Sequence, residues 1–413
     1  MLDPETPTPP GGTSSASLDA AAARRSRRVA LGDLAWLFLK LGTTAFGGPA
    51  AHIAMMEDEV VRRRGWLTRP EFLDLLGATN LIPGPNSTEL AIYVGHARAG
   101  WAGLLVAGTC FIAPAVVIVT TCAWAYLRLG RLPEAAGLLY GVKPVVIAVV
   151  VQALWRLGRT AVRGPRLALL ALGAAGASGL GVDELAVLAG AALVAVLAHL
   201  VRASGRSSSS GTGSSAVLLA PALAPSSLAG LGAAAAGAAP AVGLWPLFAF
   251  FVKVGSVLFG SGYVLLAFLR GGLVDERGWL TEAQLLDAVA IGQVTPGPVF
   301  TTATFIGYLL AGVPGAAAAT LGIFLPAFLF VAASGPLVPR LRRSRLAGAV
   351  LDGVNAASLA LMAVVTVQLA QAAVVDWLTF FLALAAAACL FGFRVNSSWL
   401  VLGGALAGLA ANA

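Results

Sequence analysis

The sequence predicts an all-α polytopic membrane protein of two inverted homologous repeats, each with broken, re-entrant helical hairpins and spanning helices. Three observations predict this fold class. The 413-residue chain is 58% hydrophobic and 11% charged, whereas soluble domains carry roughly 25% charged residues. Several apolar stretches reach the ~20 residues that a helix needs to cross membrane hydrocarbon. In addition, one set of motifs occurs twice along the chain.

The chain begins with a segment, residues 1–28, that we expect to be a disordered cytoplasmic tail. It is rich in Pro, Ser, Thr and Ala and ends in a cluster of arginines. Such a composition buries too little apolar surface to fold. A cleaved signal peptide is not expected, because the basic cluster lies far from Met1 and the apolar segment after it recurs in mid-chain.

Two repeats, residues 29–201 and 241–413, share motifs at a nearly constant shift. Residues 38–47 (FLKLGTTAFG) return as residues 251–260 (FVKVGSVLFG), a shift of 251 − 38 = 213. The same shift relates residues 65–68 to 278–281, Asp74 to Asp287, and the Pro-Gly-Pro at 83–85 to that at 296–298. Further on the shift becomes 326 − 114 = 212, between Pro114 and Pro326. Such self-similarity indicates a duplicated structural unit.

Residues 202–240 separate the repeats. Their first part, residues 202–215, contains four consecutive serines and is expected to be a flexible linker. The Ala-rich apolar stretch that follows, residues 216–239, has no counterpart ahead of the first repeat. We interpret it as an extra membrane crossing, which would invert the second repeat relative to the first.

The distribution of charge agrees with inversion. Arginine-rich loops face the cytoplasm; in the first repeat these are residues 62–64 and 156–166, and the acidic turn at 183–184 would lie outside. In the second repeat the pattern reverses, with arginines at 340–345 and only Asp376 in the stretch equivalent to 156–166. Inverted repeats are typical of secondary transporters, whose substrate site lies at the midplane where the repeats meet.

Each repeat contains two segments too interrupted to be plain spanning helices. In the first repeat, one breaks at residues 47–49 (Gly-Gly-Pro) and the other turns at residues 83–85 (Pro-Gly-Pro). A helix that begins inside a membrane presents unpaired amide N–H groups and about half a positive charge. Non-helical backbone at this depth is tolerated only where it is buried in protein or lines a cavity. The tips of these hairpins therefore predict an anion site.

Polar and basic residues near the tips are candidates for binding the oxygens of an oxyanion. Lysine within a membrane segment usually faces a cavity. The predicted substrate site comprises Lys40, Gly47, Gly48, Asn80, Pro83, Gly84, Pro85, Asn86, Ser87 and Thr88 in the first repeat, and Lys253, Gly260, Gln293, Thr295, Pro296, Gly297, Pro298 and Thr301 in the second. The alternatives are that the Pro-Gly-Pro turns are structural kinks and that the lysines snorkel to the membrane interface.

Glu89 breaks the symmetry of the repeats, because Thr302 occupies its partner position. A single carboxyl group beside an anion site is a candidate for carrying a coupling proton. Pairing with an arginine is the alternative interpretation.

Metal, redox and nucleic-acid chemistry are not predicted. The three cysteines, Cys110, Cys122 and Cys389, are far apart, and the three histidines lack metal-binding spacing. No cofactor is expected. The net charge of +8 is carried mostly by loop arginines, which set orientation in the membrane and do not indicate a nucleic-acid partner.

Three motifs look like those of the chromate ion transporter family in its long, two-domain form. They are residues 46–52 (FGGPAAH), Trp66-Leu67, and residues 80–89 (NLIPGPNSTE), and the resemblance covers nearly the whole chain. The second repeat departs from the pattern at residues 260–262 and 293–299, so the resemblance does not imply equal contributions from both halves.

The resemblance implies a non-enzymatic secondary transporter in the bacterial inner (plasma) membrane. It would export chromate from the cytoplasm, driven by the membrane potential, a proton gradient or both, and so confer chromate resistance. Sulfate would compete. The alternatives left open are a transporter or channel for sulfate or another small oxyanion, and a chromate reductase, which would need a redox cofactor. A monomer is long enough to enclose the site, and a homodimer is also compatible with the sequence.

Overall fold

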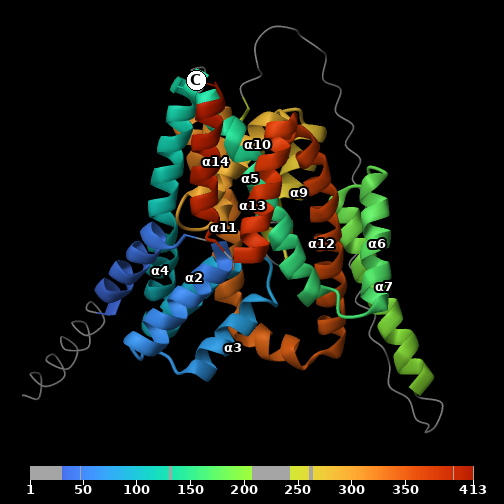
Figure 1. Ribbon diagram of the computed structural model, residues 1–413. Coiled ribbons are helices and arrows are strands. Elements are labelled where there is room, and N and C mark those ends of the chain that lie inside the picture. Colours follow the sequence, from blue (N-terminus) through green and yellow to red (C-terminus); the bar gives the residue numbers. More distant parts are fainter. Residues whose placement is uncertain are drawn as a thin grey trace, which may run out of the picture.

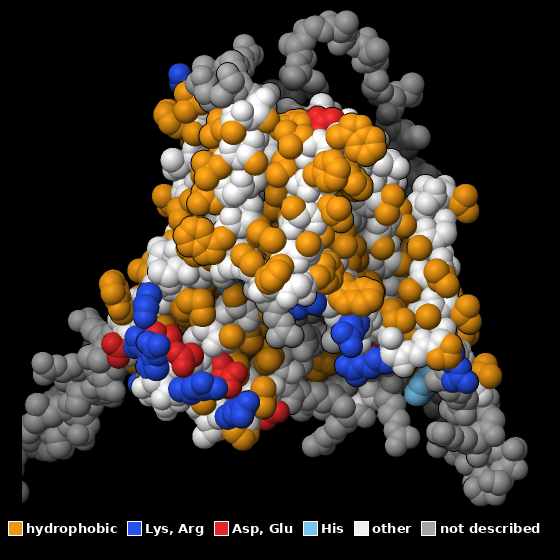
Figure 2. All heavy atoms as spheres, viewed as in Figure 1, with side chains coloured by type: hydrophobic (Ala, Val, Ile, Leu, Met, Phe, Trp, Pro, Cys, Tyr) orange, Lys and Arg blue, Asp and Glu red, His pale blue; other side chains and the backbone are white. Residues whose placement is uncertain are grey.

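The computed structural model describes residues 30–46, 48–129, 133–206, 242–259, 264–393 and 395–412. Its regular secondary structure over these residues is helical, without strands, which confirms the predicted all-α class. Five described helical stretches are long and apolar enough to cross a membrane: Asn86–Leu129, Gly137–Arg159, Glu184–Val201, Val299–Ser334 and Leu346–Ala373. In Figure 2, hydrophobic side chains cover the upper part of the visible face, and Lys and Arg gather mostly at its lower end.

The two repeats contain the same series of helices. The first consists of a helix over residues 30–44, α2 (Gly48–Glu57), η1 (Asp58–Arg63), α3 (Arg69–Thr79), α4 (Asn86–Leu129), α5 (Pro133–Ala161), α6 (Pro165–Gly179) and α7 (Glu184–Arg206). The second consists of α8 (Leu244–Val257), α9 (Leu265–Leu269), η3 (Arg270–Asp275), α10 (Glu282–Val294), η4 (Val299–Thr301), α11 (Thr302–Arg343), α12 (Arg345–Ala373), α13 (Trp377–Ala388), η5 (Cys389–Phe393) and α14 (Ser397–Asn412).

Some predicted features lie outside the described residues. They are the tail (1–28), most of the linker with the extra crossing (207–240), and the tip glycines Gly47 and Gly260. The linker was predicted to begin at residue 202, but α7 continues through Arg206. Residues 202 and 203, Arg and Ala, are good helix formers, and the four consecutive serines begin only at residue 207, so the helix outlasts the apolar pattern.

The shared motifs explain where equivalent helices begin. The Thr68 hydroxyl accepts a hydrogen bond from the Glu71 amide, and the Glu71 carboxylate accepts one from the Thr68 amide. Thr281 and Gln284 make the same reciprocal pair at the start of α10. These capping boxes satisfy amide groups that a helix start otherwise leaves unpaired. The sequence Trp-Leu-Thr that recurs in both repeats is therefore a helix-start signal.

Helix α4 is two antiparallel arms, not one straight helix. A straight helix of 44 residues would be about 66 Å long, roughly twice the hydrocarbon thickness of a membrane. The backbone leaves helical geometry at Ala99 and Gly100, where φ of Gly100 is 60°. A Cβ on Gly95 would lie 2.2 Å from the Gly103 carbonyl oxygen, so only glycine lets the arms pack this closely. Helix α11 folds back in the same way at Ala311 and Gly312.

The first arm of α4 therefore completes a second hairpin with α3, as the Pro-Gly-Pro turn predicted. Figure 1 shows α3 and its repeat equivalent α10 at opposite ends of the molecule, which is the arrangement that an inverted repeat requires. The repeats also exchange helices: α5 packs on α13 and α14 of the second repeat, and α12 packs on α6 and α7 of the first. The two halves are interlocked, and the large hydrophobic core contains residues of both.

Candidate functional site: a cavity at the hairpin tips

The hairpin tips of the two repeats meet through a reciprocal pair of hydrogen bonds. The Gly84 amide donates to the Leu258 carbonyl oxygen at 2.8 Å, and the Gly297 amide donates to the Ala45 carbonyl oxygen at 3.1 Å. These residues are repeat equivalents, since 84 + 213 = 297 and 45 + 213 = 258. The tips of one repeat are thus joined to those of the other. The Gly84 and Gly297 amides, predicted to face an anion, are used for this contact.

His52 holds the two tips of the first repeat together. Its Nε2 lies 3.0 Å from the Ala45 carbonyl oxygen and its Nδ1 lies 3.4 Å from the Ser87 hydroxyl oxygen. A neutral ring that donates from Nε2 and accepts at Nδ1 satisfies both partners. The ring is buried and packs edge-on against Phe111. The His52 ring is therefore a packed structural residue that links the two tips.

An open cavity of about 1270 Å³ lies beside these tips. Its walls include Phe46, Pro49 and Phe259 from the tips, the second half of α5, and the first half of α12. We call it the tip cavity. Since liquid water occupies about 30 Å³ per molecule, the tip cavity has room for a hydrated ion. The wall of a water-filled cavity is one of the few places within a membrane where non-helical backbone is tolerated.

Amide and hydroxyl groups line the tip cavity. Asn86 Nδ2 donates to Asn80 Oδ1 at 2.9 Å, which fixes the side chains together across the Pro-Gly-Pro turn. Nδ2 of Asn86 carries a second hydrogen. The buried Ser358 hydroxyl, on α12, has no hydrogen-bond partner among the described residues. These groups can donate hydrogen bonds to oxyanion oxygens.

Charged residues stand at the end of α5. Arg156 and Arg163 line the tip cavity and are exposed, and Asp352 on α12 also lines it. Two positive charges and one negative charge leave this wall with a net positive charge. Such a surface raises the local concentration of anions and speeds their entry.

Glu89 lies directly behind the first Pro-Gly-Pro turn. It is fully buried, and neither carboxyl oxygen has a partner among the described residues. A Cβ on Gly84 would lie 2.3 Å from Glu89 Oε1, so the carboxyl group fills the space that glycine leaves. An unpaired buried carboxylate costs several kcal/mol in a low-dielectric environment. The protonated form therefore fits this conformation.

A comparison with protein families shows which family the chain belongs to. The model of the family described as "Chromate transporter" matches residues 32–197 and 245–409, one match in each repeat. The chain belongs to the chromate transporter family.

Individual relatives agree with the chromate transporter assignment. The chain is 34% identical over 417 residues to the chromate transport protein of Cupriavidus metallidurans, covering 98% of both chains. It is 34% identical to that of Pseudomonas aeruginosa, over 81% of this chain and 80% of the relative. A probable chromate transport protein of Synechococcus elongatus is 31% identical over 86% of this chain and 88% of the relative. No solved structure matches the chain significantly.

In this chromate transporter fold, some of the predicted site residues of the first repeat come together at the tip cavity. Asn80 and Asn86 line it, and Gly48 starts α2 beside its wall. The Ser87 hydroxyl faces His52, and the buried Thr88 hydroxyl has no described partner. Among the turn prolines Pro85 is buried and Pro83 is half-buried. These prolines shape the turn.

The predicted residues of the second repeat that the structure describes do not line the tip cavity. The hydroxyls of Thr295 and Thr301 donate to carbonyl oxygens one helical turn back, those of Ile291 and Pro298. Gln293 is half-buried, and Pro296 and Pro298 are buried. The first repeat places the side-chain amides of Asn80 and Asn86 at the cavity. In the second repeat the threonine hydroxyls instead donate to carbonyl oxygens of their own backbone. The contribution of the second repeat comes from α12, from Phe259 and Val264, and from residues 390, 391 and 395–397.

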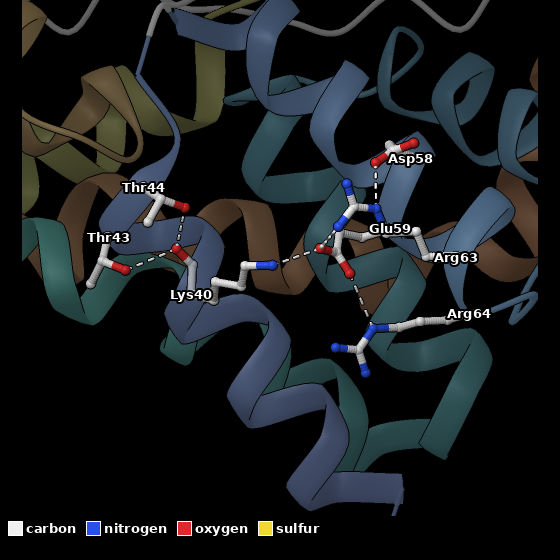
Figure 3. Close-up of polar contacts among 7 residues, drawn as sticks. All are labelled: Lys40, Thr43, Thr44, Asp58, Glu59, Arg63 and Arg64. Carbon is white, nitrogen blue, oxygen red and sulfur yellow. Dashed lines mark hydrogen bonds and ion pairs between the residues drawn. The ribbon is translucent and has the colours of Figure 1, made fainter.

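Lys40 does not supply a free charge to the chromate transporter's tip cavity. Its side chain crosses the first hairpin to Glu59 on η1 (Figure 3), and Lys40 Nζ lies 2.8 Å from Glu59 Oε1. Arg63 and Arg64 also pair with Glu59. The hydrogen bond from Lys40 lowers the pKa of this carboxyl group below its ordinary value. Lys253, the equivalent lysine, is exposed and also lies away from the tip cavity.

Sequence reasoning missed the wall formed by α5 and α12. Arg156 was interpreted as loop charge, and Gln152, Asn355 and Ser358 were not considered. The available signal was the presence of polar side chains within otherwise apolar spanning segments, which usually marks a functional pathway. Placing them in one cavity requires knowing that α5 and α12 exchange between the repeats.

Replacing Lys40 by alanine is expected to lower stability by about 1 kcal/mol and to leave substrate affinity unchanged, because a half-exposed ion pair contributes little. Because the folded-state pKa of Glu59 is depressed, this contribution is present at neutral pH and is lost as pH falls through that pKa. Thermal unfolding of the detergent-solubilised protein at neutral and acid pH measures it. A large loss of affinity with unchanged stability would instead place Lys40 in the substrate site.

Proposed function

We propose that this chain is a secondary transporter that exports chromate across the bacterial inner membrane and so confers chromate resistance. Membership of the chromate transporter family supports the substrate. The observation that carries the mechanism is the tip cavity, where broken helices from both repeats meet beside amide, hydroxyl and arginine groups. This donor set suits a tetrahedral oxyanion, and the family relatives favour chromate among such anions.

The position of the arginines supports export. The tip cavity opens where α5 ends, next to the arginine-rich residues 156–166. Loops of this kind face the cytoplasm, so substrate would enter from inside. A dianion that leaves a negative interior gains about 2 × 2.3 kcal/mol per 100 mV, or roughly three decades of concentration at 1.4 kcal/mol per decade. Export can therefore run on the membrane potential.

The inverted repeats supply an alternating-access mechanism. In such transporters one repeat rocks against the other around a fixed midplane site. In this proposal the centre of that motion is the pair of hydrogen bonds between equivalent tips. Rocking would close the tip cavity and open a passage at the opposite end. The buried Glu89 beside the tips is the candidate for coupling this change to a proton.

Uptake of labelled chromate into everted membrane vesicles tests the proposal. We expect saturable uptake that requires an imposed or respiratory membrane potential and is inhibited by excess sulfate. Vesicles that lack the protein are the control. Uptake no greater than in these vesicles would overturn the chromate assignment, and strictly linear, unsaturable flux would indicate a channel. Faster uptake of sulfate than of chromate would reassign the substrate to sulfate.

Replacing Arg156 by glutamine is expected to raise the KM for chromate roughly tenfold at low ionic strength, with little change in the maximum rate. An exposed arginine acts by attracting the anion, and salt screens this attraction. Initial uptake rates in everted vesicles at low and high salt measure it. The matched control is Arg128→Gln. Arg128 lies in the last turn of α4 and does not line the tip cavity. A KM effect that does not shrink with salt would contradict a steering role.

A further inference from the structure

A second cavity lies at the other end of α5 and α12. It has a volume of about 300 Å³ and is lined by residues that include Tyr126, Tyr140, Lys143 and Asp287. We call it the Lys143 cavity. The start of α5 and the end of α12 line it, whereas the second half of α5 and the first half of α12 line the tip cavity. The two cavities thus occupy opposite ends of the same helix pair.

Buried apolar side chains separate the two cavities. On α5, Val145 and Val146 lie between Lys143 and the first tip-cavity residue, Val149. On α12, Val365 and Leu369 lie between the corresponding segments, and these four side chains are at most 7% exposed. An ion cannot pass through such a layer without a conformational change. The apolar layer therefore closes the route between the two cavities in this conformation.

Repeat symmetry relates the Lys143 cavity to the tip cavity. At the shift of 212, Lys143 corresponds to Asn355, Ala373 to Ala161, and Val375 to Arg163. All three equivalents line the tip cavity. The Lys143 cavity is therefore the repeat-related counterpart of the substrate entrance, and in inverted-repeat transporters the two ends exchange their conformations. It differs from the entrance in having a lysine where the entrance has an asparagine.

A carboxylate occupies the Lys143 cavity in the manner expected of an anionic ligand. Lys143 Nζ lies 3.0 Å from Asp287 Oδ1, and the Tyr126 hydroxyl donates to Asp287 Oδ2 at 2.8 Å. The Tyr140 hydroxyl donates to Asp376 and ties α5 to the start of α13. The Asp287 side chain is buried, so its charge depends on these two partners. The ammonium group thus neutralises the carboxylate through a direct ion pair.

We propose that Lys143 and Tyr126 form an exit-side subsite for the transported oxyanion, in which the Asp287 carboxylate takes the place of substrate oxygens while the exit is closed. The cation and the hydroxyl are the donors that an oxyanion needs. An arriving dianion carries more charge than the carboxylate and competes with it for Lys143. Displacement of Asp287 would release α10 from α4 and α5, which opens the exit. This inference rests on the proposed export function.

The test uses everted vesicles loaded with sulfate, so that sulfate reaches the exit side while labelled chromate is supplied to the entrance. We expect Asp287→Asn to lower the luminal sulfate concentration that half-inhibits uptake by roughly tenfold, because Lys143 loses its competitor. Lys143→Gln is expected to raise that concentration by roughly tenfold. Lys143→Arg keeps the charge and is expected to stay near the wild-type value.

The opposite directions separate a binding site from a structural ion pair. A pair that only stabilises the fold predicts the same direction of change for both neutralising variants, and that result would overturn the proposal. If Asp287→Asn does not fold, the contrast between Lys143→Gln and Lys143→Arg decides the question alone. If wild-type vesicles take up no chromate, the proposed function fails. Sulfate binding to the purified wild-type and variant proteins then still tests Lys143, and unchanged binding rejects it.

Discussion

Replacing Gly84 by alanine is expected to abolish transport. Its φ of 138° is unfavourable for any residue with a side chain, and the new Cβ would lie 2.3 Å from Glu89 Oε1. Such strain at a functional turn costs about 3 kcal/mol. The hydrogen bond to Leu258 can then form only if the tip moves. Gly297→Ala should act in the same way, since its Cβ would lie 2.7 Å from that of Ala115. Chromate uptake per folded molecule measures both.

Two glycines away from the tips are matched controls for backbone strain. Gly65 and Gly278 each have a φ of 59°, and a Cβ added there would meet nothing within 4 Å. Alanine at either position should cost about 1–2 kcal/mol of backbone strain but keep uptake. If these controls lose uptake as fully as Gly84→Ala, the effect is a general loss of folding. If Gly84→Ala transports normally, the reciprocal tip contact is not needed for transport.

Replacing Glu89 by glutamine is expected to remove the response of transport to a pH gradient while the protein remains folded. Glutamine has the shape of the protonated carboxyl group that fits the buried position, but it cannot release a proton. Initial uptake in everted vesicles, with the membrane potential clamped and the pH gradient varied, measures the effect. Thr302→Val, at the repeat-equivalent position, is the control and should leave the pH response intact. An unchanged pH response in Glu89→Gln would exclude Glu89 as the coupling group.

The sequence predicted the architecture well because the duplication repeats local signals. The capping threonines, the Pro-Gly-Pro turns and the arginine-rich loops each report on structure within a few residues of themselves. The break after residue 44 and the turn between α3 and α4 lie where the glycines and prolines indicated. Such local signals can be recognised without knowledge of the tertiary fold.

Which residues line the site depends on contacts between residues far apart in the sequence, and local signals do not report such contacts. Lys40 was expected at the anion site, but Glu59 on the returning arm of the same hairpin pairs with it. Gly84 and Gly297 were expected to offer amides to an anion, but each amide bonds the tip of the other repeat. Ser358 was missed because its helix crosses to the other half. A lysine in an apolar segment therefore indicates a nearby ion-pair partner as readily as ligand binding.

The most direct test of the central claim is equilibrium binding of labelled chromate to the purified protein, comparing wild type with Asn86→Ala and Lys40→Ala. An oxyanion site at the hairpin tips predicts saturable binding that weakens roughly tenfold in Asn86→Ala, because one hydrogen bond to a charged ligand is lost. Lys40→Ala should bind as wild type does. Binding that is lost in Lys40→Ala but unchanged in Asn86→Ala would contradict a site in the tip cavity.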